Sequence, residues 1–383
     1  MTLSLILCSR NDSYMGNSVW RLETALNFVS ARLAEIGRID QAEIVLTDWG
    51  SDTPLHDTLR LTATAQSLVR FVHVPPAVAM PLQRDSPFPE VIALNAAARR
   101  ARGRFVGRID QDTLVGADFL RAFFSIADGT RDLGVVPDDT LFFSNHRRVP
   151  YGFASLCPSL DVVERFVSQF GRRFMNDHTN PRAPYYSAGV GIWLLPRAVW
   201  NASGGYDERM IYMNWMEVRM VERLTPRHKM VDLGRILDYD FYHLEHYHPT
   251  ALRKSAAHRV TNNQREYEDA GRYTQNGDAW GLAAQPVVES RSTTASVPAR
   301  APLASLGYAW LLGYVGLRLL RDGVLRRVSI LRREWPRVSG HWARRTRLAL
   351  GIVLRHAPWQ WRGAVTAARA ANRLRPAPGE DEK

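Results

Sequence analysis

The sequence predicts an α/β fold with a mostly parallel sheet, followed by a basic α-helical C-terminal extension. Short apolar runs alternate with amphipathic helical segments over the first 110 residues. The chain has 383 residues and a net charge of +12, and residues 300–383 hold 16 Arg and one Lys against five acids, so this segment accounts for the whole excess. The hydrophobic share of 45% and the charged share of 23% exclude a wholly disordered or fibrous chain.

The N-terminal third predicts βαβ units. Apolar runs predict strands at residues 3–8, 43–47, 69–74 and 104–109, and helical periodicity predicts helices at 20–36, 55–68 and 90–102. We expect Gly103 to cap the third of these helices. Strands that alternate with helices in this order favour a parallel sheet, which binds ligands at the carboxyl ends of its strands.

The rest of the sequence predicts the second half of the domain and a basic C-terminal region. Helices are expected at 118–127 and 213–224, and strands within 137–148, 184–195 and 236–247. Residues 281–302 are rich in Ala, Ser, Thr and Pro, which favours a linker. The predicted organisation is therefore a domain over 1–280 (halves at about 1–115 and 116–280), a linker over 281–302, a basic amphipathic helical region over 303–376 and an acidic, polar tail over 377–383.

Two acids directly follow the predicted strand 104–109. Asp110 and Asp112 can point into one cleft if the chain turns there, and Mg²⁺ or Mn²⁺ typically bridges such carboxylates to substrate phosphates. A helix N-cap or a solvated turn is the other interpretation. Asp48 follows the second strand, where it can accept hydrogen bonds from a base or ribose, or simply form a turn.

Further candidates lie in the second half. Glu217, at the start of a predicted helix, is a candidate general base if it faces the cleft; otherwise it complements the helix dipole. His243, His246 and His248 fall within six residues without the spacing of a zinc site. We expect one of them to contact a phosphate or a metal, and the others to pack or lie at the surface.

Seven motifs then occur in an order that resembles the GT-A fold of glycosyltransferase family 2, of the bacterial surface-polysaccharide type. The likeness spans about residues 2–247. The motifs are residues 5–11 (LILCSRN), 43–51 (EIVLTDWGS), 95–103 (NAAARRARG), 108–112 (RIDQD), 204–208 (GGYDE), 215–217 (WME) with Arg223, and 243–246 (HLEH).

The resemblance implies a role for each matching residue. The nucleotide-sugar donor would lie against Ser9, Arg10, Asn11, Asp48, Asn95, Arg99 and Asp110. Asp112, with Asp110 and with His243 or His246, would hold Mn²⁺ or Mg²⁺, and Glu217 would be the catalytic base. The substrate side would include Gly204, Gly205, Asp207, Trp215 and Arg223. Met216 and Arg219 stand where the family has acids, so the chain departs from the pattern on the acceptor side.

The implied activity is inverting transfer of a sugar from a nucleoside-diphosphate sugar, expected to be UDP-linked. The acceptor would be a saccharide or a lipid-linked molecule in bacterial polysaccharide or glycolipid biosynthesis. Two alternatives are a catalytically inactive nucleotide-sugar-binding protein and a scaffold whose function lies in the basic tail.

The basic region has three interpretations. Arg interleaved with Trp, Leu and Val favours a helix on an anionic membrane surface; nucleic-acid binding and packing on the body or on a partner are the others. No recognised nucleic-acid module accompanies it, which disfavours the second. Residues 301–317 carry no charge but fall short of the ~20 residues of a membrane span.

The expected location is the cytoplasm, with peripheral association at the inner face of the bacterial plasma membrane. Cys8 and Cys157 cannot form a disulfide framework, which favours a reducing compartment. The N-terminus lacks the basic region of a signal peptide.

Overall fold

A computed structural model describes residues 1–174, 191–212, 215–237, 240–246, 263, 267, 276–298, 312–313, 316–317 and 324. The chain divides into two compact units, Met1–Leu319 and Leu320–Lys383. Only residue 324 of the second unit is described, so the fold below is that of the first. Within the described residues, no helix is long and apolar enough to cross a membrane.

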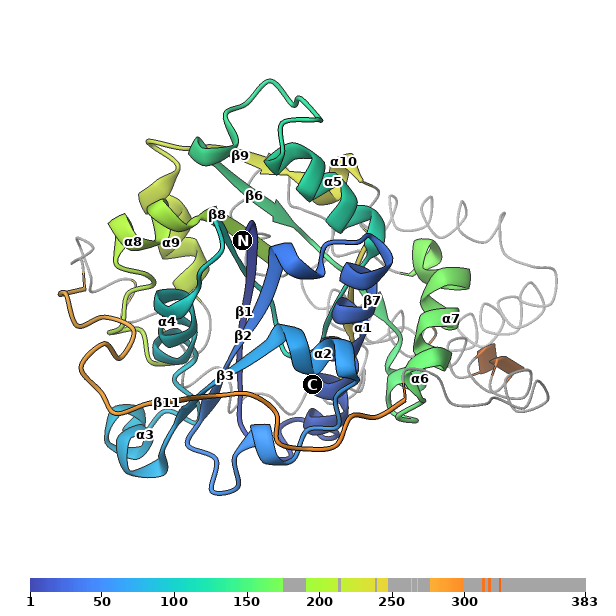
Figure 1. The fold of residues 1–383 in the computed structure, drawn as a ribbon, viewed down its shortest axis with the longest axis horizontal. Coiled ribbons are helices and arrows are strands. Elements are labelled where there is room, and N and C mark those ends of the chain that lie inside the picture. Colours follow the sequence, from blue (N-terminus) through green and yellow to red (C-terminus); the bar gives the residue numbers. More distant parts are fainter. Residues whose placement is uncertain are drawn as a thin grey trace, which may run out of the picture. The chain divides into compact units, whose positions relative to one another are not determined.

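The main sheet has eight strands in the order β11-β3-β2-β1-β4-β8-β6-β9, which confirms the α/β fold with a mostly parallel sheet (Figure 1). Its strands are β1 (Leu3–Ser9), β2 (Ala42–Trp49), β3 (Val69–Val74), β4 (Phe105–Arg108), β6 (Thr140–Ser144), β8 (Ile192–Pro196), β9 (Lys229–Asp232) and β11 (Val288–Ser290). The β1–β2, β2–β3, β1–β4 and β6–β9 pairs are parallel, and the β4–β8, β6–β8 and β11–β3 pairs are antiparallel. A second sheet joins β5 (Thr113–Val115), β10 (Phe241–Leu244) and β7 (Arg147–Val149).

The helices cover both faces of the main sheet (Figure 1). They are α1 (Ser18–Glu35), α2 (Ala63–Leu68), α3 (Pro76–Gln83), α4 (Glu90–Arg100), α5 (Ala117–Ala127), α6 (Tyr151–Ala154), α7 (Leu160–Phe170), α8 (Arg197–Ser203), α9 (Met216–Leu224) and α10 (Leu233–Ile236). Short 3₁₀ turns occur at Ile39–Gln41, Leu55–Asp57, Pro137–Asp139 and Gly171–Arg173.

The side chains of the buried strands alternate between the two faces of the sheet, where they form two hydrophobic cores. In β1, Leu5 and Leu7 face the core formed with α1, α2 and α5, whereas Ile6 faces the core formed with α4, α8 and α9. Successive side chains of a strand point to opposite faces, so a strand buried on both sides reads as an unbroken apolar run. The four N-terminal strands were predictable for this reason.

Two predicted helices differ from the structure. Residues 55–68 form a 3₁₀ turn and the short helix α2 instead of one helix, because Thr62 caps α2 and its N–H donates to Asn27 Oδ1 at 2.8 Å. Helix α4 ends at Arg100 with Ala101 as its C-cap, so Gly103 is not the cap. A Cβ on Gly103 would lie 2.5 Å from the backbone N of Ser4, so glycine allows the chain to pass close to β1.

The second half also differs in detail. The predicted helix 213–224 begins at Met216, and residues 213–214 lie outside the described residues. The predicted strand 184–195 is β8 from Ile192 onward, and 184–190 are not described. Within 236–247 only Phe241–Leu244 is a strand, and His248 is not described.

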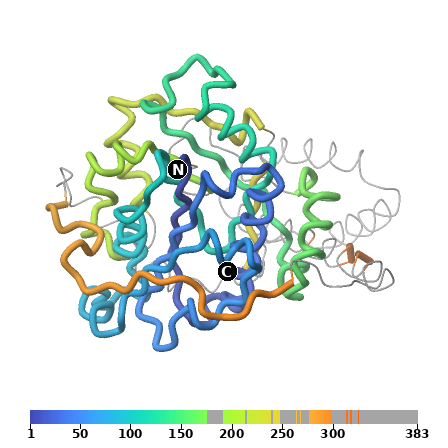
Figure 2. Tube along the Cα trace, in the orientation of Figure 1, coloured from blue at the N-terminus to red at the C-terminus, as the bar shows by residue number. Residues whose placement is uncertain are grey.

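Residues 281–298, expected as a linker, lie along the body as the orange segment of Figure 2. Their strand β11 pairs with β3, and Arg291 donates to the Val69 carbonyl at 2.9 Å. Thr294 Oγ1 donates to the Leu59 carbonyl at 2.8 Å. Polar side chains without periodicity suggested a linker, but backbone pairing with a sheet edge does not require such a pattern.

Candidate active site

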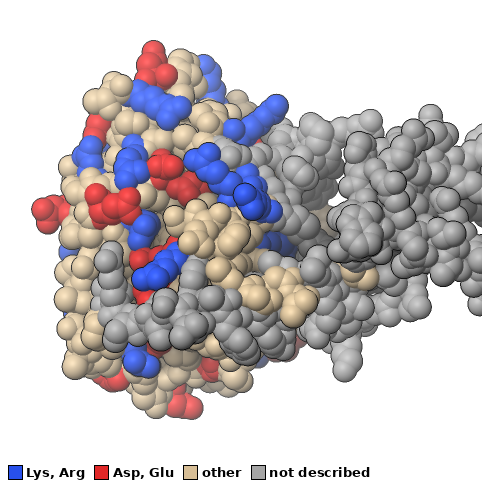
Figure 3. All heavy atoms as spheres, turned by 90° about the vertical axis from the view of Figure 1, so that its right-hand side faces the viewer, with Lys and Arg blue, Asp and Glu red and all other residues tan. Residues whose placement is uncertain are grey.

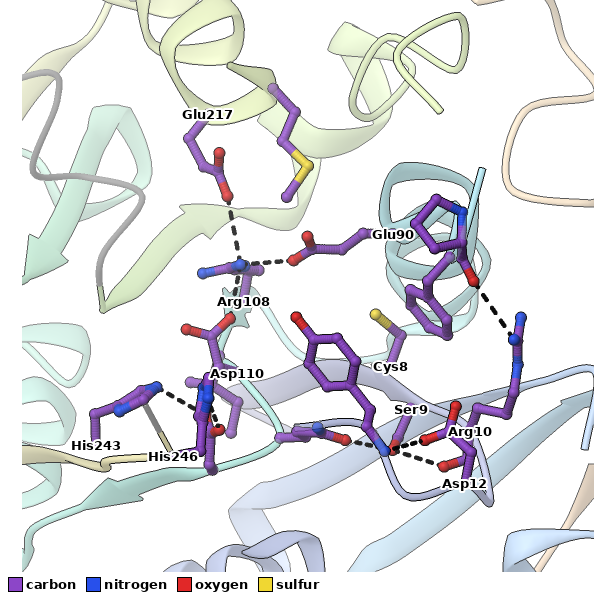
Figure 4. A pocket seen from close by; sticks show the side chains of 17 residues that line it. Cys8, Ser9, Arg10, Asp12, Glu90, Arg108, Asp110, Glu217, His243 and His246 are labelled. Atoms are coloured by element: carbon purple, nitrogen blue, oxygen red, sulfur yellow. Dashed lines mark hydrogen bonds and ion pairs between the residues drawn. The ribbon is translucent and has the colours of Figure 1, made fainter. Parts of the chain in front are cut away.

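A cavity of about 320 Å³ opens at the carboxyl ends of β1 and β4 (Figure 4). This is the edge of the sheet where a mostly parallel α/β fold binds its ligands. Its walls come from the loop after β1, the turn 109–112 after β4, the start of α4, the start of α9 and the region of β10. The lining residues are Cys8, Ser9, Arg10, Asp12, Tyr14, Pro87, Phe88, Glu90, Arg108, Ile109, Asp110, Gln111, Asp112, Met216, Glu217, His243 and His246.

Asp112 lies at the centre of the first polar cluster. Its Oδ1 is 3.1 Å from His243 Nε2, and its Oδ2 is 3.3 Å from His246 Nε2 and 2.5 Å from Arg21 Nη1. Side chains of Arg21 and Asp112 are only 2% and 3% exposed, so this ion pair is screened little by solvent. The guanidinium and the two imidazole rings thus stabilise a carboxylate that is buried away from solvent.

The pKa values of this cluster follow from burial and charge. Burial alone would raise the pKa of Asp112, but His243, His246 and Arg21 outweigh it and hold that pKa well below its usual range. Burial opposes the protonation of His243, yet Asp112 raises its pKa. Burial lowers the pKa of His246 to about 4, so this ring is neutral near pH 7.

The same residues could hold a metal ion. One ligand atom from each of Asp112, His243 and His246 lies within 4.8 Å of the others. Imidazole nitrogens suit first-row transition ions better than Mg²⁺, whereas the carboxylate suits either class. His243 presents its Nε2 to Asp112. Its other ring nitrogen, Nδ1, is buried without a hydrogen-bond partner among the described residues.

A second polar cluster surrounds Arg108, the last residue of β4. Its Nη2 lies 2.7 Å from Glu90 Oε1, 2.7 Å from Asp110 Oδ1 and 3.4 Å from Glu217 Oε1. Figure 4 shows these three carboxylates converging on the guanidinium from α4, the turn after β4 and α9. Burial raises the pKa of Glu217 to about 7, although Arg108 opposes the shift. Burial also raises the pKa of Asp110.

The structure brings seven of the predicted site residues to one cavity. They are Ser9, Arg10, Asp110, Asp112, Glu217, His243 and His246. Ser9 Oγ donates to Gln111 Oε1 at 2.5 Å, which ties the end of β1 to the turn after β4. Arg10 Nε donates to the Trp49 carbonyl at 3.0 Å.

The predicted donor residues Asn11, Asp48, Asn95 and Arg99 do not line the cavity. Asp48 is fully buried and accepts hydrogen bonds from Ser51 Oγ and from the Leu55 N–H, with His73 Nδ1 at 3.1 Å. Asn95 is also fully buried, and Arg99 donates to the Trp280 carbonyl at 3.0 Å. Asn11 Nδ2 donates to the Thr53 carbonyl at 2.9 Å.

The predicted substrate residues Gly204, Gly205, Asp207, Trp215 and Arg223 lie outside the lining too. Gly204 and Gly205 have φ of +66° and +74° in the turn after α8. Arg223 donates to the Ser203 and Gly205 carbonyls at 2.8 and 3.2 Å. Asp207 pairs with Arg209, and the Trp215 ring packs 4.8 Å from that of Tyr267.

Sequence reasoning missed Arg21, Glu90 and Arg108. Arg108 ends the otherwise apolar strand β4, and a charge there must be paired once it is buried. Arg21 shares the apolar face of α1 with Ala25 and Phe28 at helical spacing, which carries the same signal. Glu90 had no such signal, because an acid in the first turn of a helix is common.

A scan against protein-family models finds no match, and a search of curated proteins finds none either. Among solved structures, residues 1–349 of TarS from S. aureus align with 70% of this chain and 68% of that chain, at 13% identity and a TM-score of 0.36. The same TarS fragment in complex with UDP-GlcNAc aligns with 70% and 69%, at 13% identity and a TM-score of 0.36. The mannosyltransferase PcManGT from Pyrobaculum calidifontis, in complex with GDP-Man and Mn²⁺, aligns with 95% and 83%, at 15% identity and a TM-score of 0.35. At these values the likeness assigns no activity.

Replacing Arg21 with Met should destabilise the protein by about 3–5 kcal/mol, because it removes one partner of a buried ion pair. Urea denaturation at pH 7 measures this. The matched control is Arg121→Met, which breaks the exposed pairs with Asp118 and Glu35 and should cost under about 1 kcal/mol. Equal losses in the two variants would contradict the structural importance of the Asp112 cluster.

Proposed function

We propose that this chain is an inverting glycosyltransferase that uses a nucleoside-diphosphate sugar, with UDP-sugars as the first donors to test. One observation carries the proposal: a buried carboxylate with a pKa near 7 and an Asp-His-His cluster line the same cavity at the carboxyl edge of the sheet. Sugar transfer needs a base for the acceptor and a positive centre for the departing diphosphate, and the cavity offers candidates for both.

Glu217 is the proposed base. It would accept the proton of an acceptor hydroxyl while that oxygen attacks the anomeric carbon, and the bond to the nucleoside diphosphate would break in the same displacement. A pKa of about 7 suits this task, because the group is substantially ionised near neutrality and still basic enough to take a proton. No covalent intermediate with the protein is involved.

Asp112, His243 and His246 are the proposed metal ligands, and Mn²⁺ fits the mixed nitrogen and oxygen set better than Mg²⁺. Such an ion would offset the negative charge of the diphosphate. Asp110, Ser9 and Arg10 line the cavity beside this cluster and are the proposed donor contacts. Direct donor contacts from Asp48, Asn95 and Arg99 are not part of the proposal, because these side chains are engaged inside the protein.

Calorimetric titration of the full chain with UDP and GDP tests the donor site. We expect binding of UDP that requires Mn²⁺ and that weakens about 10- to 100-fold in Asp112→Asn, because a neutral amide replaces the charged carboxylate ligand. The control Asp138→Asn alters an exposed acid and should bind as the wild type does. Metal-independent binding, or unchanged binding in Asp112→Asn, would contradict the assignment; binding of GDP alone would change the donor class.

Substituting Glu217 with Gln tests the base. We expect kcat for UDP release from a UDP-sugar in the presence of a saccharide acceptor to fall about 10²- to 10⁴-fold, with nucleotide binding retained. The wild-type rate should rise with pH through about 7, as Glu217 loses its proton, and this rise should be absent from the variant.

The control Glu222→Gln lies on the same helix at an exposed position and should keep both the rate and the pH profile. A full rate in Glu217→Gln would exclude Glu217 as the base. Nucleotide binding without turnover in the wild type would favour the catalytically inactive binding protein.

The basic residues beyond 299 are proposed to bind an anionic membrane surface, where a lipid-linked acceptor would be presented. Acidic and basic side chains are interspersed on the described surface in Figure 3, whereas residues 300–383 hold 17 basic residues against five acids. A polybasic segment gains roughly 1 kcal/mol per basic residue near an anionic leaflet.

Co-sedimentation of the full chain with phosphatidylglycerol vesicles tests this interaction. We expect binding that is lost at high salt, that is absent with phosphatidylcholine, and that weakens when Arg332, Arg333, Arg344 and Arg345 are changed to Gln. Equal binding to neutral vesicles, or tighter binding to duplex DNA, would contradict the membrane assignment.

A further inference from the structure

Arg108 contacts carboxylates from three different elements of the cavity, which are α4, the turn after β4 and α9. Its side chain is 5% exposed, and one nitrogen, Nη2, lies within 3.4 Å of Glu90, Asp110 and Glu217. The arginine is carried by β4, a central strand of the sheet, so its backbone is fixed by pairing on both sides. Of the three acids, Glu90 and Glu217 lie in the first turns of α4 and α9, and Asp110 follows β4.

The cluster around Arg108 holds more negative than positive groups. Three carboxylates surround one guanidinium, and the side chains of Glu217, Glu90 and Asp110 are 10%, 22% and 29% exposed. Carboxylates this close to one another repel, and burial adds to the cost of ionising all three. An arginine stays charged under these conditions and holds its donors in a rigid planar group, whereas the flexible ammonium of a lysine loses its proton more readily when it is buried.

We propose that Arg108 is a positioning residue for Glu217: it fixes the carboxylate of the base at the cavity wall and keeps it ionisable against the two neighbouring acids. The role in catalysis rests on the proposed function, but the effect on Glu217 itself does not. The arginine touches no reacting atom in this scheme and acts through the carboxylate it holds.

The groups that face Glu217 set the direction of each effect. Burial raises its pKa most, Arg108 lowers it, and Glu90 on α4 and Asp110 after β4 raise it. Tyr206 also lies near; burial raises the pKa of this phenol, so it is neutral beside Glu217. Removing Arg108 should therefore make Glu217 harder to ionise, and removing the charge of Glu90 should make it easier.

The titration of Glu217 can be measured directly, without substrate. Protein labelled with glutamate ¹³C at Cδ gives one carboxyl resonance per Glu, and the resonance missing from Glu217→Gln assigns it. We expect its midpoint to rise by about one to three pH units in Arg108→Met, the range for losing an opposite charge at this distance. In Glu90→Gln the midpoint should fall below that of the wild type.

Two further variants separate positioning from general stability. Arg70→Met removes another buried arginine, which is paired with Glu43 at 3.0 Å and does not line the cavity, and should leave the midpoint unchanged. Arg108→Lys keeps the charge and should give a midpoint nearer to the wild type than Arg108→Met does. If Arg108→Met does not fold, as judged by circular dichroism, Glu90→Gln and Arg108→Lys decide the question.

An unchanged midpoint in Arg108→Met or in Glu90→Gln would overturn the proposal, and so would an equal shift in Arg70→Met. The pH–rate profile of any active variant should move with the midpoint. Failure of the proposed function would appear instead as absent sugar transfer in a wild type whose Glu217 midpoint still responds to Arg108.

Discussion

Pairing of buried charge at the end of β4 is the constraint on which the cavity depends. At the carboxyl edge of the sheet Asp112 is buried and Asp110 is partly buried, and a buried carboxylate without a partner is strongly disfavoured. Asp112 pairs with Arg21 and the two histidines, whereas Asp110 pairs with Arg108. The turn between them is therefore held from two sides by cations that the scaffold itself supplies.

The segment that follows α8 and leads to α9 shows how the scaffold supports this arrangement. Asn95 binds both the N–H and the carbonyl of Tyr206, and a Cβ on Gly205 would lie 2.4 Å from its Oδ1. Glu208 accepts a hydrogen bond from the Gly281 N–H at 2.7 Å, so the segment along β3 also holds the turn that leads towards Glu217. Residues whose motif suggested ligand contacts thus act here by fixing the path of the chain.

The sequence allowed the sheet and the acids to be predicted, but not their partners. Apolar runs such as Leu5–Leu7 mark buried strands, and Asp112, Glu217 and His243 stood at recognisable motif positions. Contacts between distant segments leave no such pattern in the sequence. Arg108 and Glu217 are more than a hundred positions apart, and β11 joins the sheet through backbone pairing with β3 and an ion pair between Glu289 and Arg70. The burial of Asp48 was hidden for the same reason, because His73 comes from the next strand.

The two clusters show how one cavity can give two carboxylates opposite properties. Asp112 and Glu217 are both buried, and burial pushes both pKa values upward. Asp112 faces three nitrogen groups and stays ionised, whereas Glu217 shares a single arginine with two other acids and retains a proton up to about pH 7. Separate pKa values of this kind mark distinct roles, one suited to a permanent negative ligand and the other to proton transfer. The ratio of cations to carboxylates in each cluster, more than depth of burial, sets that division.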